Sequence, residues 1–192
     1  MKKLHTIPTA LDGVVLLDPP RLSDTRGLFR PLFAQRLHAD AGYDHHWAEM
    51  NLSYTKQGCV RGLHFQEPNS QAKLISVVEG TIFDVVVDLR PDSATFGKWE
   101  SFTLSASDTA HPSQIYIPEG FAHGLATPQG PATIAYLVSR QWDPDSEHAL
   151  LWNDPELAIA WPINQPELSP RDRAGTTLAE LKRILKPGYP KK

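Results

Sequence analysis

Pro118-Glu119-Gly120-Phe121-Ala122-His123-Gly124 is the stretch that decides the fold, and Arg61-Gly62-Leu63-His64-Phe65-Gln66 precedes it in the chain. The later stretch has the form P-x-G-x-x-H, in which a turn glycine is followed by a histidine. The earlier stretch carries an arginine and a histidine in a strand-like run. Together they indicate a β-rich protein in which charged and imidazole side chains accompany the strands.

The form P-x-G-x-x-H resembles the second conserved motif of cupin barrels, and the earlier stretch lies where a cupin places its metal-binding H-x-H and downstream Glu. Gln66 stands at the position of the second His, and Lys73 stands at the position of the Glu. An ammonium group has no lone pair to donate and repels a cation. The sequence therefore predicts no metal site and no cofactor, and a barrel mouth equipped for acid–base chemistry.

Composition limits the function classes. The chain has 192 residues, of which 21% are charged, and a formal net charge of -3, so no large basic field favours nucleic acid. Its single cysteine allows no internal disulfide and suits a reducing compartment. No secretory signal and no apolar stretch long enough to span a membrane is apparent. We expect one domain over residues 1–192 in a cytoplasmic protein that binds neither nucleic acid nor membrane.

Short runs rich in β-branched and aromatic residues alternate with turn signals, which is typical of an all-β sandwich or barrel. The predicted strands cover residues 14–17, 73–78, 81–89, 97–104, 113–117 and 133–139. With the cupin-like motif, they predict a cupin-type double-stranded β-helix, or jelly roll, with short flanking helices. We expect the barrel at about residues 45–140 and a C-terminal loop and short helix at 164–192.

Local signals add finer predictions. Glu79-Gly80 predicts a tight hairpin turn between two strands. Helices are predicted at 34–41 and at 178–185, where Thr177 and Glu180 have the spacing of a capping box. Six histidines lie in polar or irregular surroundings and are expected at the surface: His5, His38, His45, His46, His111 and His148.

Segments along nearly the whole chain resemble the dTDP-4-dehydrorhamnose 3,5-epimerases, which are cupin-fold epimerases of dTDP-sugars. The matching segments occur in order and at nearly the family's spacing, so the signal is far more specific than a lone P-x-G-x-x-H. They are residues 24–27, 61–66, 71–74, 83–90, 93–99, 117–124, 152–155, 159–162 and 168–172.

The resemblance implies proton exchange at the carbons that flank the C4 ketone of a 4-keto-6-deoxyhexose. Such a reaction needs a base, a positive group for the enolate oxygen and an acid on the opposite face. His64 matches the family's base, and Asp172 matches its carboxylate partner. Lys73 matches the enolate-stabilising residue, and Tyr136 matches the acid. From the residues alone, Tyr136 could instead be a packed strand aromatic and Asp172 a helix cap or turn residue.

The resemblance also implies a nucleotide-diphosphate-sugar substrate, and arginine is the usual partner of phosphates. Residues at matching substrate-binding positions are Arg26, Phe29, Asn51, Ser53, Arg61, Gln71 and His123. Three of these have alternative explanations. Arg61 could form an ion pair with an aspartate such as Asp84, Phe29 could belong to the barrel core, and His123 could be structural.

Three departures from the family pattern leave the specificity open. Pro31 and Glu49 replace the family's usual Glu and Gln in the region expected to read the nucleotide, and Gln141 replaces a second tyrosine. Epimerisation at C3 only, or another nucleotide carrier, is therefore an alternative. A non-catalytic cupin sugar-binding module and a metal-dependent cupin dioxygenase are further alternatives. The family resemblance implies a homodimer, in which the N-terminal strand-like segments could pair across the interface.

Overall fold

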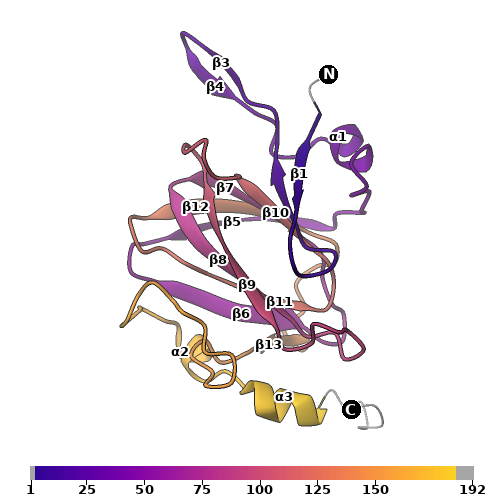
Figure 1. Cartoon of the computed structure of the whole chain (residues 1–192), viewed down its shortest axis with the longest axis vertical. Coiled ribbons are helices and arrows are strands. Elements are labelled where there is room, and N and C mark those ends of the chain that lie inside the picture. The colour runs from indigo at the N-terminus through magenta and orange to yellow at the C-terminus, as the bar shows by residue number, and fades with distance from the viewer. Residues whose placement is uncertain (1–2, 185–192) are drawn as a thin grey trace.

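The computed structural model describes residues 3–184, whose two large β-sheets pack face to face (Figure 1). In spatial order, the six-stranded sheet contains β1 (His5–Pro8), β2 (Val15–Asp18), β10 (Gln114–Ile117), β7 (Lys73–Glu79), β12 (Ala132–Val138) and β5 (Glu49–Thr55). The five-stranded sheet contains β13 (Glu147–Ala149), β6 (Val60–Gln66), β11 (Phe121–Ala126), β8 (Thr81–Asp88) and β9 (Trp99–Ser105). This arrangement confirms the predicted all-β, cupin-like fold.

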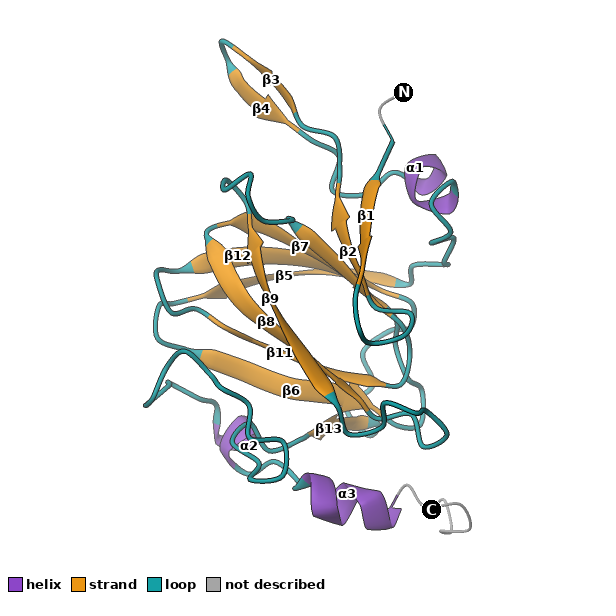
Figure 2. Cartoon of the chain, in the orientation of Figure 1, coloured by secondary structure: helices purple, strands orange, loops and turns teal. Residues whose placement is uncertain are grey.

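Helices are few and short, as Figure 2 shows. They are α1 (Gln35–Ala39), α2 (Pro170–Arg173) and α3 (Leu178–Ile184). The helices predicted at 34–41 and 178–185 correspond to α1 and α3, although residue 185 lies outside the described residues. Thr177 and Glu180 form the predicted capping box, since each backbone N–H donates to the other residue's side chain. Among residues 3–184, no helix is long and apolar enough to cross a membrane.

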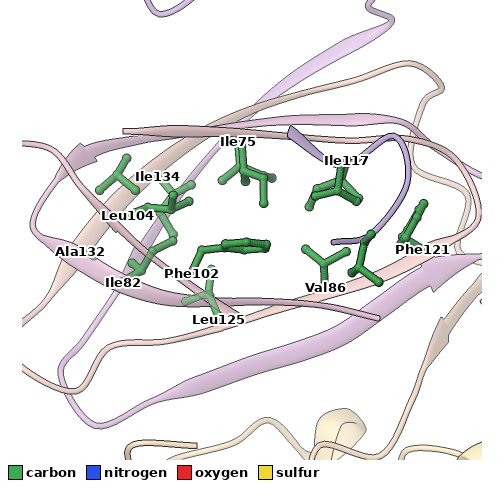
Figure 3. Close-up of a cluster of buried hydrophobic side chains, with 14 of the residues drawn as sticks. Ile75, Ile82, Val86, Phe102, Leu104, Ile117, Phe121, Leu125, Ala132 and Ile134 are labelled. Atoms are coloured by element: carbon green, nitrogen blue, oxygen red, sulfur yellow. The ribbon is translucent and has the colours of Figure 1, made fainter. Parts of the chain in front are cut away.

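The two inner faces meet in an apolar core (Figure 3). Ile75, Ile117 and Ile134 come from the six-stranded sheet and pack against residues of the other sheet such as Phe102 and Leu125. The β-branched run of β8 is buried along nearly its whole length because both faces of its sheet are covered. This core fixes the separation of the sheets.

The prediction of a hairpin at Glu79-Gly80 is wrong. β7 belongs to the six-stranded sheet and β8 to the five-stranded sheet, so the turn carries the chain from one sheet to the other. The glycine itself is required there, because Gly80 has a φ of 79° and a Cβ would lie 2.3 Å from the Pro131 carbonyl oxygen. A tight turn signal does not reveal whether the following strand pairs with the preceding one.

Loops and short helices cover parts of the outer faces of both sheets. Leu157, Ile159, Leu178 and Leu181 of the C-terminal region pack on the five-stranded sheet. The region around α1 covers part of the six-stranded sheet. His38 on α1 is fully buried, so its predicted surface position is wrong. His38 is buried because the α1 region packs on the sheet through its apolar side chains, although the sequence around His38 is polar.

A separate hairpin of β3 (Leu22–Asp24) and β4 (Gly27–Phe29) stands away from both sheets (Figure 1). Its apolar side chains Leu22, Leu28 and Phe29 are exposed. Within the described chain, the hairpin pairs with neither of the two large sheets.

Candidate active site

A cavity of about 420 Å³ lies between the sheets and takes side chains from both. The five-stranded sheet contributes Arg61, His64 and His123 to its wall, and the six-stranded sheet contributes Lys73 and Tyr136. The core residues Ile75, Leu125 and Ile134 also line it. The cavity therefore has apolar residues as well as titratable groups in its wall, which is the composition expected of a small-molecule site.

Two glycines bring β6 and β11 together at this wall. A Cβ on Gly62 would lie 2.6 Å from the His123 carbonyl oxygen, and one on Gly124 would lie 2.8 Å from the Arg61 carbonyl oxygen. The register between the strands is irregular next to His123. His64 and His123 are direct cross-strand partners, and both reach the cavity.

His64 is partly exposed to the cavity and pairs with the buried side chain of Asp172. Its Nε2 lies 2.7 Å from Asp172 Oδ1, and the Gly62 amide donates to Asp172 Oδ2 at 3.4 Å. Burial acts to raise the pKa of Asp172, but the bonds from His64 and Gly62 outweigh it and hold the pKa below its ordinary value. The ionised carboxylate can thus orient the imidazole with Nε2–H toward it and leave Nδ1 as the basic nitrogen.

Asp172 lies in α2, a single helical turn whose N-cap is Ser169. The Ser169 hydroxyl accepts a bond from the Asp172 amide at 3.1 Å. Asp172 therefore lies in the first turn of a capped helix, next to the cap that its local sequence suggests. Its side chain also reaches His64.

His123 forms a second pair of the same kind. Its Nε2 lies 2.7 Å from Asp84 Oδ2, and both side chains are buried. Arg61 does not pair with Asp84. It donates instead to the Thr55 hydroxyl at 2.8 Å and to the Tyr54 carbonyl at 3.2 Å.

Lys73 reaches the cavity at the start of β7, and its Nζ donates to the His64 carbonyl at 3.3 Å. Burial lowers the pKa of Lys73 to about 8, against the opposing effect of the Glu147 and Asp84 carboxylates. At neutral pH the side chain is therefore mainly an ammonium, next to the strand that carries His64.

Tyr136 on β12 belongs to the sheet opposite His64. Burial raises the pKa of Tyr136, an effect that the positive charge of Arg61 opposes. The phenol therefore stays protonated at neutral pH and can donate a proton from the wall opposite His64.

The remaining predicted binding residues fall into two groups. Asn51, Ser53 and Gln71 line the cavity, where Asn51 donates to Glu49 at 2.6 Å and Gln71 to the Arg140 carbonyl at 2.8 Å. Arg26 and Phe29 lie on the β3–β4 hairpin and do not line the cavity of their own chain. The Arg26 side chain is 88% exposed and pairs with Asp24, and Phe29 is 67% exposed.

Besides apolar residues of the cavity wall, sequence reasoning missed two residues whose side chains bring polar groups to it, Trp142 and Glu147. Trp142 is 56% exposed although it is aromatic, and its indole Nε1 donates to Glu147 at 2.6 Å. Their proximity to Pro144 and Asp145 in a turn-rich segment gives the appearance of an ordinary surface loop.

At the position of the second cupin ligand, the Gln66 amide donates to the Asn69 carbonyl at 2.9 Å and its oxygen accepts from the Asp143 amide at 3.0 Å. In the part of the chain that the structure describes, no group of three or more His, Cys, Asp and Glu side chains is arranged to hold a metal ion.

Comparison with known proteins gives consistent matches. A family model for dTDP-4-dehydrorhamnose 3,5-epimerases matches residues 8–180. The dTDP-4-dehydrorhamnose 3,5-epimerase of Neisseria gonorrhoeae is 42% identical over 92% of this chain, which spans 53% of that relative's length. The dTDP-4-dehydrorhamnose 3-epimerase of Streptomyces niveus is 42% identical over 90% of this chain and 83% of its own.

Among solved structures, the dTDP-4-dehydrorhamnose 3,5-epimerase of Bacillus anthracis, with TDP and PPi bound, has a TM-score of 0.86 and 40% identity. The match covers 91% of this chain and 99% of that one. The family match over residues 8–180 includes the strands that form the cavity. The chain therefore belongs to the dTDP-4-dehydrorhamnose 3,5-epimerase family of carbohydrate isomerases.

Proposed function

We propose that this protein epimerises C3 and C5 of a nucleotide-linked 4-keto-6-deoxyhexose, converting dTDP-4-dehydro-6-deoxyglucose into dTDP-4-dehydrorhamnose. The observation that carries the proposal is the placement of His64, which pairs with Asp172, and of Tyr136 on the two sheets that enclose one cavity, together with Lys73. Inversion at a carbon needs a base and an acid on opposite faces of the sugar ring, and this arrangement can supply them.

In the proposed reaction, Nδ1 of His64 removes the proton from a carbon next to the C4 ketone. The electron pair moves onto the ketone oxygen, and the Lys73 ammonium stabilises the enolate that forms. Tyr136 then protonates the carbon from the other face, and the enolate returns to the ketone. Asp172 keeps His64 in the correct tautomer and stabilises the imidazolium. Exchange with solvent resets the protons on His64 and Tyr136 before the second carbon reacts.

Arg61 is proposed to bind the diphosphate, because its guanidinium lies in the cavity wall and its partners there are neutral oxygens of Thr55 and Tyr54. A guanidinium without a carboxylate partner retains its full charge for phosphate. Asn51, Ser53, Gln71 and His123 would hold other polar parts of the substrate.

Arg26 and Phe29 are proposed to reach the cavity of a second copy in a homodimer. Strand β5 lies at an edge of the six-stranded sheet, with Asn51 and Ser53 in the cavity wall and its exposed apolar residues Met50, Leu52 and Tyr54 alternating with them. An unpaired edge with exposed apolar side chains is a surface that a partner strand can cover. A partner's β3–β4 hairpin at this edge would carry Arg26 and Phe29 toward the substrate.

Epimerisation at C3 alone is the second candidate. Gln141 departs from the family's tyrosine next to the cavity residue Trp142. The Streptomyces niveus relative, a dTDP-4-dehydrorhamnose 3-epimerase, is as similar to this chain as the 3,5-epimerase of Neisseria gonorrhoeae.

The test is solvent deuterium incorporation into dTDP-4-keto-6-deoxyglucose, followed by NMR at C3 and C5. Deuterium at both carbons is the expected result, and deuterium at C3 alone would support the 3-epimerase. If no label enters this substrate, the same measurement on other nucleotide-linked 4-keto sugars tests the alternative carriers. Binding without label for all of them would overturn the proposal in favour of a non-catalytic sugar-binding module.

A further inference from the structure

Glu147 on β13 connects the cavity wall with the segment that carries Asp172. Its Oε2 accepts one hydrogen bond from the Trp142 indole at 2.6 Å and another from Nη1 of Arg171. Burial acts to raise the pKa of Glu147, but the bonds from Trp142 and Arg171 outweigh it and lower the pKa. Glu147, whose side chain is only 15% exposed, therefore remains a carboxylate and can hold both donors.

Helix α2 depends on its attachments, because a single turn of four residues has no stability of its own. Two consecutive side chains attach it to the barrel. Arg171 reaches Glu147 on β13, and Asp172 reaches His64 on β6.

These attachment points lie on adjacent strands. β13 and β6 pair in the five-stranded sheet, with Ala149 opposite His64 and Glu147 opposite Gln66. Backbone bonds at Glu167 and Thr176 hold the chain on either side of the turn, and the two side chains hold the turn itself. Two attachments on neighbouring strands restrict both the position and the rotation of the turn, and therefore the direction in which the Asp172 carboxylate points.

We propose that Glu147 and Arg171 are positioning residues, whose ion pair holds α2 so that Asp172 stays in hydrogen-bond contact with His64. The kinetic consequence rests on the proposed function, while the effect on the His64–Asp172 bond does not. Arg171 is 43% exposed, and an exposed ion pair contributes little to the free energy of folding. Its removal is therefore expected to change the geometry of the site rather than the stability of the barrel.

The experiment compares wild type with Arg171→Gln in the full chain by two measurements. The first is the NMR signal of the His64 imidazole N–H that faces Asp172, assigned by its loss in His64→Asn. The His123 N–H that faces Asp84 gives an internal control on the neighbouring strand. The second is the steady-state rate of solvent deuterium exchange into the nucleotide sugar.

In Arg171→Gln, the His64 signal should shift or broaden while the His123 signal stays unchanged. The kcat should fall about 10- to 100-fold, because a small misplacement of a catalytic group has a large effect on rate. KM should change by less than about threefold, since the interaction lost acts on the reacting geometry. Arg171→Lys keeps a cation opposite Glu147 and should recover most of the kcat.

Variants of Glu147 and Trp142 separate the bond that Glu147 accepts from Arg171 from the bond that it accepts from Trp142. Glu147→Gln should lower kcat at least as much as Arg171→Gln, and the double variant should be no worse than Glu147→Gln alone. Trp142→Phe removes the other donor to Glu147 and should leave the His64 signal in place. Glu156→Gln is the matched control, because it breaks the Glu156–Lys182 pair of the C-terminal region outside the cavity wall. It should change neither measurement.

An Arg171→Gln protein with wild-type kcat and an unchanged His64 signal would overturn the inference. Additive losses in the double variant would also overturn it, since they would mean that Glu147 does not act through Arg171. If the wild type itself shows no exchange with any nucleotide sugar tested, the proposed function fails. The NMR comparison then decides the positioning claim alone.

Discussion

Asp172 Oδ1 lies 2.7 Å from His64 Nε2, although 108 residues separate the two along the chain. The imidazole comes from a central barrel strand and the carboxylate from a capped helical turn in the C-terminal region. Because the Nε2 side of the ring faces Asp172, Nδ1 is the nitrogen available to take a proton from substrate. The C-terminal segment is therefore a component of the candidate catalytic site as well as a cover for the barrel.

We predict that His64→Ala lowers the rate of deuterium exchange by about 10²- to 10⁴-fold, the usual contribution of a general base. Asp172→Asn should have a smaller effect, of about 10- to 100-fold, because it disturbs the tautomer and orientation of His64 while the base remains. NMR of the labelled sugar gives the rates, and circular dichroism checks that both variants keep the barrel. A folded His64→Ala protein with the wild-type exchange rate would remove His64 from the mechanism.

Lys73 predicts a pH dependence. Its pKa of about 8 means that the ammonium is present below this pH and is lost as the pH rises through it. If the ammonium stabilises the enolate, kcat/KM for exchange, which reports the pKa values of the free enzyme, should decline above about pH 8. Lys73→Met should lower the rate about 10²- to 10³-fold near neutral pH, as expected for the loss of an oxyanion partner.

Lys73→Arg is the control for that prediction, because a guanidinium keeps its charge throughout the accessible pH range. Its rate should be lower overall, since the group has a different shape, but the decline above pH 8 should disappear. An unchanged alkaline decline in Lys73→Arg would assign the titration to another group.

Much of the fold could be predicted from the sequence because its signals are local. The β-branched runs predict strands whose ends differ by at most two residues from those of the corresponding strands in the structure, and the capping box at Thr177 is recognisable. The partner of each strand is not a local property, so the turn signal at Gly80 predicts a hairpin although the turn joins the two sheets. Burial of His38 likewise depends on packing between distant segments.

The candidate site divides in the same way. His64 and Lys73 lie close to recognisable motifs, whereas Asp172 was identified through resemblance to a family rather than through any signal in its own loop. Trp142 and Glu147 escaped detection because their importance lies in their contacts with each other and with Arg171. The separation of Arg26 and Phe29 from the cavity of their own chain could be seen only in three dimensions.

Tyr136→Phe should separate proton exchange from inversion. His64 can still remove a proton and return a deuteron to the same face, whereas the phenol that is proposed to protonate the carbon from the opposite wall is lost. We therefore predict that label continues to enter the unepimerised sugar while formation of the epimer falls about 100-fold or more. NMR measures the label and chromatography measures the epimer. Equal loss of both would place Tyr136 in an earlier step or in substrate binding.

Complementation between two inactive variants tests whether Arg26 acts on a second copy. His64→Ala destroys the base of a subunit's own cavity, and Arg26→Ala removes a side chain that lies outside it. If the β3–β4 hairpin serves the partner, a mixed dimer contains one cavity that lacks both groups and one that is intact. Co-expression of the two variants should then restore about a quarter of the wild-type rate, since half of the randomly formed dimers are mixed and each has one working site of two.

Light scattering gives the mass of the assembly, and Leu28→Glu on the same hairpin should reduce the dimer fraction, because it places a charge on an exposed apolar face. A monomeric wild type, or a co-expressed mixture no more active than its components, would place Arg26 outside the functional site.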